Sequence, residues 1–177
     1  EFCIDKLYDP GSLGGRRGLL EMRAFEMPPH WKMSAMQQSL IGAILCLMRN
    51  HPPEPRLVRW GLDLRDRFMI PYYIREDLRE VLADLRRIDL EFALELFDPF
   101  FEFRFPVYGE VLYPGLRLEL RMGLEPWNVL GEEAHTGGTS RAVDSATERM
   151  QVTLEGDPAG RYEIACNGYR VPLKKVG

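Results

Sequence analysis

Two short segments near the start of the chain are predicted to be strands, and the second of them alternates apolar and polar residues. They cover residues 2–9 and 19–27, and the turn residues of 10–15 lie between them. This order predicts an antiparallel strand pair. In the second strand Glu21 and Arg23 share a face, because successive side chains of a strand point to opposite sides.

The next segments have apolar residues at helical spacing. This spacing predicts one helix over residues 34–48 and a second over residues 74–88. Ser34 and Gln37 match the capping-box pattern, in which two side chains bond the free N–H groups of the first turn, so we expect the first helix to begin there. Cys46 falls among apolar residues of this helix and is expected to be a buried thiol.

After Pro99 the pattern changes to strict alternation, which predicts antiparallel strands with one face in water. The segments expected to be strands are 101–105, 116–122, 149–154 and 161–166. Asn167-Gly168 predicts a two-residue hairpin turn, with the chain returning over 169–173. Residues 131–140 are expected to form a mobile loop.

These elements predict an α+β fold: an antiparallel strand pair with two main helices, followed by a mostly antiparallel β half. We place the boundary so that residues 1–98 form the α+β piece and residues 99–177 the β-rich region.

Composition excludes several classes of protein. The net charge of −4 provides no general attraction to nucleic acid or to an anionic membrane surface. The chain lacks an apolar run of about 18 residues, so it is not expected to span a membrane. Its three cysteines form no C-x-x-C pair, which argues against a disulfide framework or a zinc site and favours a reducing cytoplasm.

The strongest candidate for chemistry is Glu21-x-Arg23-x-x-Glu26. A carboxylate is a hard oxygen ligand for Mg²⁺, and an arginine beside it can bind a phosphate or carboxylate through two hydrogen bonds. The same Glu-x-Arg spacing begins at Glu102 and at Glu119, where we expect structural ion pairs within hairpins. An exposed pair on a sheet face is therefore the alternative for Glu21 and Arg23 as well.

Other positions could contact an anion or supply a nucleophile. Arg16 and Arg17 lie in a glycine-rich loop without P-loop spacing, which is either a phosphate contact or a plain hairpin loop. Arg59 and Arg67 flank an apolar run and could line an anion-binding pocket or form surface pairs. The histidines lack the spacing of metal ligands, and a Cys–His nucleophile would need the two residue types to meet in space.

Longer runs carry a family resemblance. They are residues 18–30, 58–61, 66–71, 101–106, 108–110, 124–127, 129–133 and 166–168. Together they resemble a large bacterial family of unknown function, the putative amidoligases, whose members are commonly fused to a transglutaminase-like region upstream. The resemblance implies a fold and chemistry similar to glutamine synthetase and γ-glutamylcysteine ligase, and it implies that this chain is an internal fragment of a longer protein.

In such ligases a strand carries a Glu-x-Arg element before a helix, and its residues contact a divalent metal and the acyl phosphate. The resemblance therefore implies ATP and Mg²⁺ as cofactors, with Glu21 as the metal ligand and Arg23 and Glu26 as catalytic residues. The implied nucleotide contacts are Arg16, Arg17 and Arg59. Two positions, Arg65 and Phe100, stand where the family leads us to expect histidines.

The implied reaction joins an amino-acid or peptide carboxylate to an amine through an acyl phosphate. The remaining metal ligands would lie upstream, next to the transglutaminase-like region of the same polypeptide, so the fragment alone is expected to be inactive. The alternative is a non-catalytic binding or scaffold module, formed by residues 99–177 within a larger multidomain protein.

Overall fold

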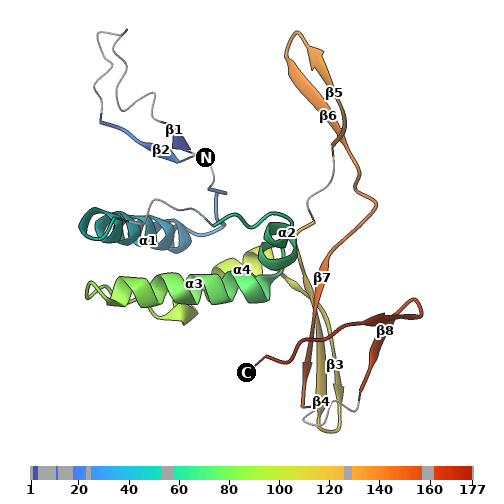
Figure 1. Ribbon diagram of the computed structural model, residues 1–177. Helices are drawn as coiled ribbons and strands as arrows, with labels where there is room; N and C mark the ends of the chain where they lie inside the picture. The colour runs from blue at the N-terminus through green and yellow to red at the C-terminus, as the bar shows by residue number, and fades with distance from the viewer. Residues whose placement is uncertain are drawn as a thin grey trace. The chain divides into compact units, whose positions relative to one another are not determined.

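The computed structural model describes residues 2–3, 11, 18–22, 25–52, 58–125, 129–156 and 162–176, without the side chains of Phe2, Cys3 and Asp66. The chain divides into two compact units, Glu1–Gly42 and Ala43–Gly177, and the division falls inside a helix. The fold is α+β, as predicted, with its longer helices in the first half and antiparallel strands later (Figure 1). The boundary expected between residues 98 and 99 stays a prediction.

The first unit contains the predicted antiparallel strand pair in a shorter form. Strand β1 is Phe2–Cys3 and strand β2 is Glu21–Met22, with Cys3 opposite Glu21. The second strand was expected over 19–27, but residues 19–20 and 25–27 are not in a strand. An isolated two-stranded pair is marginally stable in water, so strand-like alternation alone does not fix how far such a pair extends. Residues 4–9 of the first predicted strand lie outside the described residues.

Helix α1, Trp31–Asn50, confirms the first predicted helix and extends it at both ends. The capping-box expectation was wrong, because the ring Nδ1 of His30 accepts a hydrogen bond of 3.1 Å from the Lys32 backbone N–H. Ser34 therefore lies inside the helix. Cys46 is exposed, which corrects the expectation of a buried thiol, since apolar residues lie on several sides of α1 and not all of them are covered.

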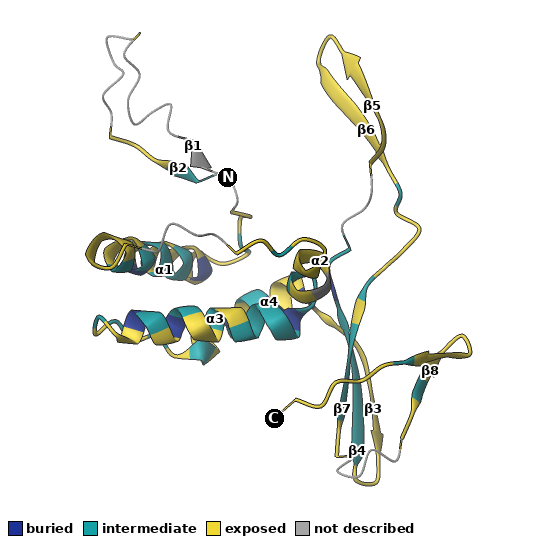
Figure 2. Cartoon of the chain, in the orientation of Figure 1, coloured by how far each residue is buried: buried dark blue, intermediate teal, exposed yellow. Residues whose placement is uncertain are grey.

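Helix α3, Pro71–Arg86, confirms the second predicted helix with shifted ends. Pro71 at its start has no N–H that would need a partner, and its fixed backbone angle suits a first helical turn. Leu82 and Leu85 are buried on one face (Figure 2). The six-residue helix α2, Asp63–Phe68, precedes it and was not predicted, because so short a segment shows no clear periodicity.

The segment 101–105 was expected to be a strand and is helical. Helix α4, Asp98–Arg104, follows the 3₁₀ turn η1, Leu94–Phe97. Three phenylalanines at four-residue spacing, Phe97, Phe101 and Phe105, are buried at 5%, 8% and 4% exposure. The strict alternation was produced by Phe103, which is 44% exposed. Arg75 of α3 holds α4 through Asp98 at 2.5 Å and lies over the Phe101 ring.

The larger unit also holds a three-stranded antiparallel sheet in the order β3-β4-β7. Its strands are Val107–Tyr113, Leu116–Met122 and Met150–Glu155, and the last two confirm predicted strands. One face of β4 carries leucines and the other carries charges, as its alternation predicts. At the end of the sheet a side chain at Gly156 would collide with the carbonyl oxygen of Gly115.

The expectation of a loop over 131–140 was wrong. Strands β5, Val129–His135, and β6, Gly138–Val143, form an antiparallel hairpin, with His135 opposite Gly138. All residues of both strands are exposed, so the hairpin buries no hydrophobic stripe that a sequence pattern could reveal.

The hairpin predicted at Asn167-Gly168 is confirmed. Strands β8, Ile164–Cys166, and β9, Tyr169–Val171, are antiparallel, with Cys166 opposite Tyr169. Both turn residues have positive φ, 50° at Asn167 and 82° at Gly168, as the primed turn requires.

The helical burial of the phenylalanines is testable. Phe101→Ala should lower the free energy of unfolding by about 3–5 kcal/mol, because it leaves a cavity in the core. Phe103→Ala should cost less than about 1 kcal/mol, because the ring is largely in water. Equal losses in urea unfolding would instead support the strand pattern, in which both rings share a face.

Asp89 provides a second test. After α3, the Leu90 N–H donates to the Leu85 carbonyl at 3.2 Å and the Asp89 N–H donates to the Arg86 carbonyl at 3.1 Å, with Asp89 at φ 59°. Glycine prefers this position, so Asp89→Gly should raise stability by about 0.5–1 kcal/mol. Asp89→Ala should lower it, and a melting curve that ranks the two variants in the opposite order would contradict this geometry.

Candidate functional site

The residues expected to carry chemistry are only partly described. Glu21 lies on β2 with a half-buried side chain, and Glu26 is exposed beyond the strand. Arg16, Arg17 and Arg23 lie outside the described residues, so their expected roles stay predictions. Neither Glu21 nor Glu26 is without an interaction partner in the structure.

Arg59 is described and exposed. Within the part of the chain that the structure describes, no cluster of three His, Cys, Asp or Glu side chains could hold a metal ion. Cys46 and Cys166 are free and exposed thiols.

Glu102 and Glu119, from the second and third Glu-x-Arg elements, belong to one ion network. Arg121 bonds Glu119 at 3.0 Å on its own strand and Glu102 at 2.7 Å on α4. Arg117 bonds the other oxygen of Glu119 at 2.7 Å. Arg117 also bonds Glu110 at 2.8 Å, so it separates two glutamates that face each other across β3 and β4. Glu102 was expected in a hairpin and instead joins a helix to the sheet.

The structure gives one contact at each of the two positions where histidines were expected. The carbonyl of Arg65 accepts a hydrogen bond of 2.8 Å from the Arg149 guanidinium, which links α2 to the segment before β7. The ring of Phe100 lies 6.1 Å from the ring of Phe97.

The guanidinium of Arg67 lies among aromatic rings, in a cluster that also contains a second cation. This guanidinium lies 4.9 Å from the Trp60 ring centroid and 5.6 Å from that of Tyr73. The Lys174 ammonium lies 5.9 Å from the same Tyr73 ring. Stacking of this kind orients a cation without neutralising it. Tyr73 and Lys174 were not singled out from the sequence, because they are a hundred positions apart and no spacing connects them.

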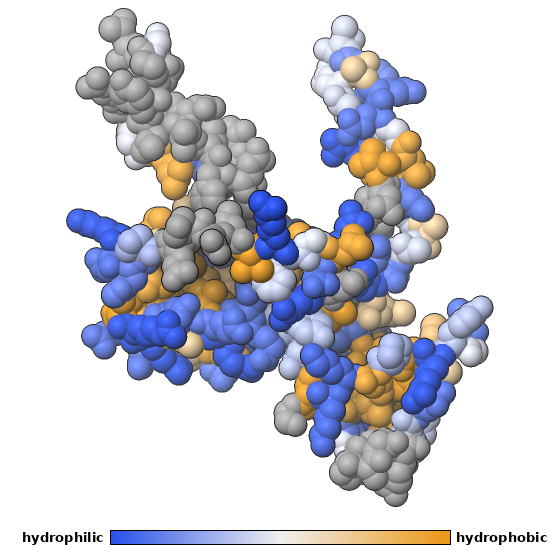
Figure 3. All heavy atoms as spheres, in the orientation of Figure 1, coloured by the Kyte–Doolittle hydropathy of each residue, from blue (hydrophilic) through white to orange (hydrophobic). Residues whose placement is uncertain are grey.

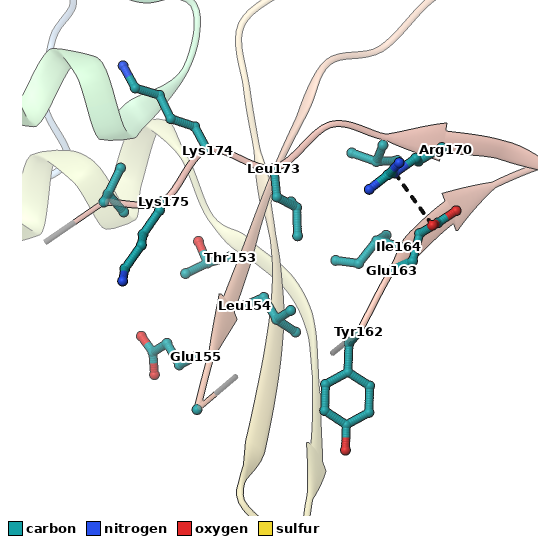
Figure 4. Close-up of a pocket in the computed structure, with 13 residues that line it drawn as sticks. Thr153, Leu154, Glu155, Tyr162, Glu163, Ile164, Arg170, Leu173, Lys174 and Lys175 are labelled. Carbon is teal, nitrogen blue, oxygen red and sulfur yellow. Dashed lines mark ion pairs between the residues drawn. The ribbon is translucent and has the colours of Figure 1, made fainter. Parts of the chain in front are cut away.

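Two adjoining pockets lie beside β7. The larger has a volume of 940 Å³ and is lined by residues 153–156, 162–164, 170–171 and 173–176 (Figure 4). The smaller, of 410 Å³, is lined by residues 70, 72–73, 150–154, 171–174 and 176. In the close-up Leu173 points toward Leu154 and Ile164. The space-filling view shows apolar side chains gathered over this sheet, with hydrophilic ones around them (Figure 3).

A third pocket lies between α1 and α3 and has a volume of 560 Å³. Its walls are mostly aliphatic, with His51, Asp84 and Arg87 at its border. Asp84 and Arg87 are paired with each other at 2.8 Å.

The runs noted in the sequence belong to a family whose description names a ligase class of enzyme. The family model described as "Putative amidoligase enzyme (DUF2126)" matches residues 1–177, so the chain belongs to this family. No curated protein and no solved structure matches the chain. Among the described helices, none has the length and apolar character needed to cross a membrane.

The charge network predicts a response to acid. The hydrogen bond from Arg117 lowers the pKa of Glu110, which outweighs the opposing effect of burial. A carboxylate with a lowered folded-state pKa stabilises the fold above its ordinary pKa, and this stabilisation is lost as pH falls through the lowered value. The melting temperature should therefore fall as the pH drops below the ordinary pKa of a glutamate, 4.5, and it should fall less in Arg117→Met. Parallel pH profiles for the two proteins would show that this pair does not contribute.

Proposed function

We propose that the protein is part of an ATP-dependent carboxylate–amine ligase. The observation that carries this proposal is the family match over residues 1–177. In the proposed reaction a carboxylate oxygen attacks the γ-phosphorus of ATP, which gives an acyl phosphate and ADP. An amine then attacks the acyl carbon, phosphate leaves, and an amide bond remains after loss of a proton.

Within this proposal Glu21 is the metal ligand. Mg²⁺ commonly uses one or two protein carboxylates and takes its other oxygens from phosphates and water. The half-buried carboxylate of Glu21 fits such a role as a single donor. When bound, the ion would offset negative charge on the phosphates.

Arg23 is proposed to hold the transferred phosphoryl group, and Glu26 to assist the amine by accepting its proton. Arg16, Arg17 and Arg59 are proposed to contact the other phosphates of ATP. An arginine suits these roles because its planar fork donates two parallel hydrogen bonds to phosphate oxygens. We further propose that the reaction takes place in the cytoplasm, on a polypeptide that also carries a transglutaminase-like region upstream.

A second candidate, a non-catalytic binding module in the β-rich region, is favoured by the pockets beside β7. The two candidates differ in whether ATP is consumed. A binding module would retain a peptide without releasing phosphate.

Substitutions in the Glu-x-Arg element test the ligase. Glu21→Gln removes the charge of the metal ligand, and Arg23→Lys removes the fork but keeps the charge. In the full-length protein each should lower ATP-dependent phosphate release by about 100-fold, as the loss of a preorganised electrostatic group typically does. Neither should change the melting temperature by much.

The control is an exposed glutamate–arginine pair elsewhere. Glu132 and Arg141 meet at 2.6 Å on the β5–β6 hairpin, and both side chains are about half exposed, at 49% and 59%. Glu132→Gln and Arg141→Lys should leave turnover unchanged. Glu119 is a poor control, because its side chain is only 12% exposed and binds two arginines. If all four variants keep full activity, Glu21 and Arg23 are ordinary surface charges.

A further inference from the structure

The two pockets beside β7 form one groove along the outer edge of that strand. The smaller is lined by the consecutive residues 150–154 and the larger by the consecutive residues 153–156. Side chains of successive residues in a strand point to opposite faces, so a hollow that meets all of them lies along the strand's edge. The two pockets also share lining residues from the segment 171–176.

The outer edge of β7 is available for pairing. The sheet order is β3-β4-β7, so β4 is the only neighbour of β7 among the strands that the structure describes. No backbone hydrogen bond from a described residue reaches this outer edge from another segment. An unpaired strand edge is a template for an added strand, in which main-chain bonds supply affinity and flanking pockets read the side chains.

The groove has surplus positive charge. Its lining acids are both engaged, Glu155 with Arg117 at 3.2 Å and Glu163 with Arg170 at 3.5 Å. Lys174 and Lys175 make no ion pair with any carboxylate among the described residues. Their side chains leave the backbone in different directions, so a cation lies on either side of the segment that borders the groove (Figure 4).

Lys174 is also held in place. It lies over the Tyr73 ring, which it shares with Arg67, and both Tyr73 and Lys174 line the smaller pocket. The remaining walls are largely aliphatic, with Leu154, Ile164 and Leu173 around the larger pocket. This combination complements an anionic group attached to an extended apolar chain.

We propose that the groove binds an extended peptide as an additional strand beside β7, with a carboxylate of that peptide near Lys174 and Lys175. We identify this peptide as the carboxylate substrate of the ligase, and that identification rests on the proposed function. Binding itself requires only the groove.

Fluorescence anisotropy with full-length protein tests the binding. The probe is Gly-Val-Leu-Val-Leu with an N-terminal fluorescein and a free C-terminal carboxylate, and the comparison peptide is its C-terminal amide. The acid should bind about tenfold more tightly than the amide, and added salt should weaken this preference. The double variant Lys174→Met, Lys175→Met should bind the two peptides equally, since methionine keeps the apolar stem and removes the charge.

A matched control is present on α1. Lys32 also lies 5.9 Å from an aromatic ring, that of Trp31, and Lys32→Met should leave the preference for the acid unchanged. Two further peptides test the added strand, one N-methylated at the odd-numbered residues and the other at the even-numbered residues. In a strand every second N–H faces the neighbouring strand, so one of these two peptides must lack the main-chain donors that face β7. That methylation pattern should abolish binding.

In the binding assay, either equal affinity for acid and amide or full binding by both methylated peptides would overturn the proposed groove. A dimer that forms through β7, seen in sedimentation and unaffected by the peptide, would also overturn it, because a second copy would then occupy the edge. Peptide binding without any ATP-dependent turnover would support the proposed peptide-binding groove and contradict the proposed ligase activity. Turnover with an unchanged KM for the peptide in the double lysine variant would reject the groove and leave the ligase.

Discussion

Arg121 connects the helices of the larger unit to its sheet. From the central strand β4 its guanidinium bonds Glu119 beside it, Glu102 on α4 and the carbonyl of Phe105 at the end of that helix. Its side chain is only 16% exposed, so these bonds are weakened by water less than most surface pairs are. Loss of the arginine would leave Glu119, at 12% exposure, with one partner fewer in a partly dry setting.

The position of β7, and hence of the groove, depends on this junction. Strand β7 pairs with β4 in a fixed register that places Gln151 opposite Arg121. The Gln151 side chain accepts a hydrogen bond of 2.7 Å from the Tyr72 backbone at the start of α3. The Leu124 N–H donates to the Met69 carbonyl, also at 2.7 Å, so the segment at the start of α3 is joined to the sheet both at β7 and just after the end of β4. The ion network and these backbone contacts therefore hold the strand edge beside Tyr73 and Lys174.

The sequence predicted elements whose local pattern and packing agree. Strand β4 has leucines and charges on opposite faces, and Asn167-Gly168 has the backbone freedom that its turn needs. The segment 101–105 was wrongly predicted to be a strand because Phe-Glu-Phe-Arg-Phe fits both the alternation of a strand and the four-residue spacing of a helix. The contact of Phe101 with Arg75 and the continuation of the spacing from Phe97 favour the helix. The β5–β6 hairpin has no buried stripe, so its main-chain pairing leaves no trace in the hydrophobic pattern.

For the candidate site, too, part could be predicted from the sequence and part could not. Spacing alone singled out three Glu-x-Arg elements, and it could not distinguish the ion network of Glu119 and Arg121 from a pair that binds a ligand. The roles of Glu21, Glu26 and Arg59 rest on resemblance, as do those of Arg16, Arg17 and Arg23, which lie outside the described residues. The groove beside β7 could not be predicted, because it forms where Tyr73, Leu154 and Lys174 meet from distant parts of the sequence.

Gly156 limits how this family can diverge. It follows β7, lines the larger pocket and has a φ of 88°, with the Gly115 carbonyl pressed against the place where a side chain would begin. Any other residue would have to adopt a strained backbone and displace the neighbouring turn. Substitutions should therefore be tolerated at the exposed charged residues of the hairpins but not at this position. Selection would retain the glycine because of the backbone conformation alone, without any role for a side chain.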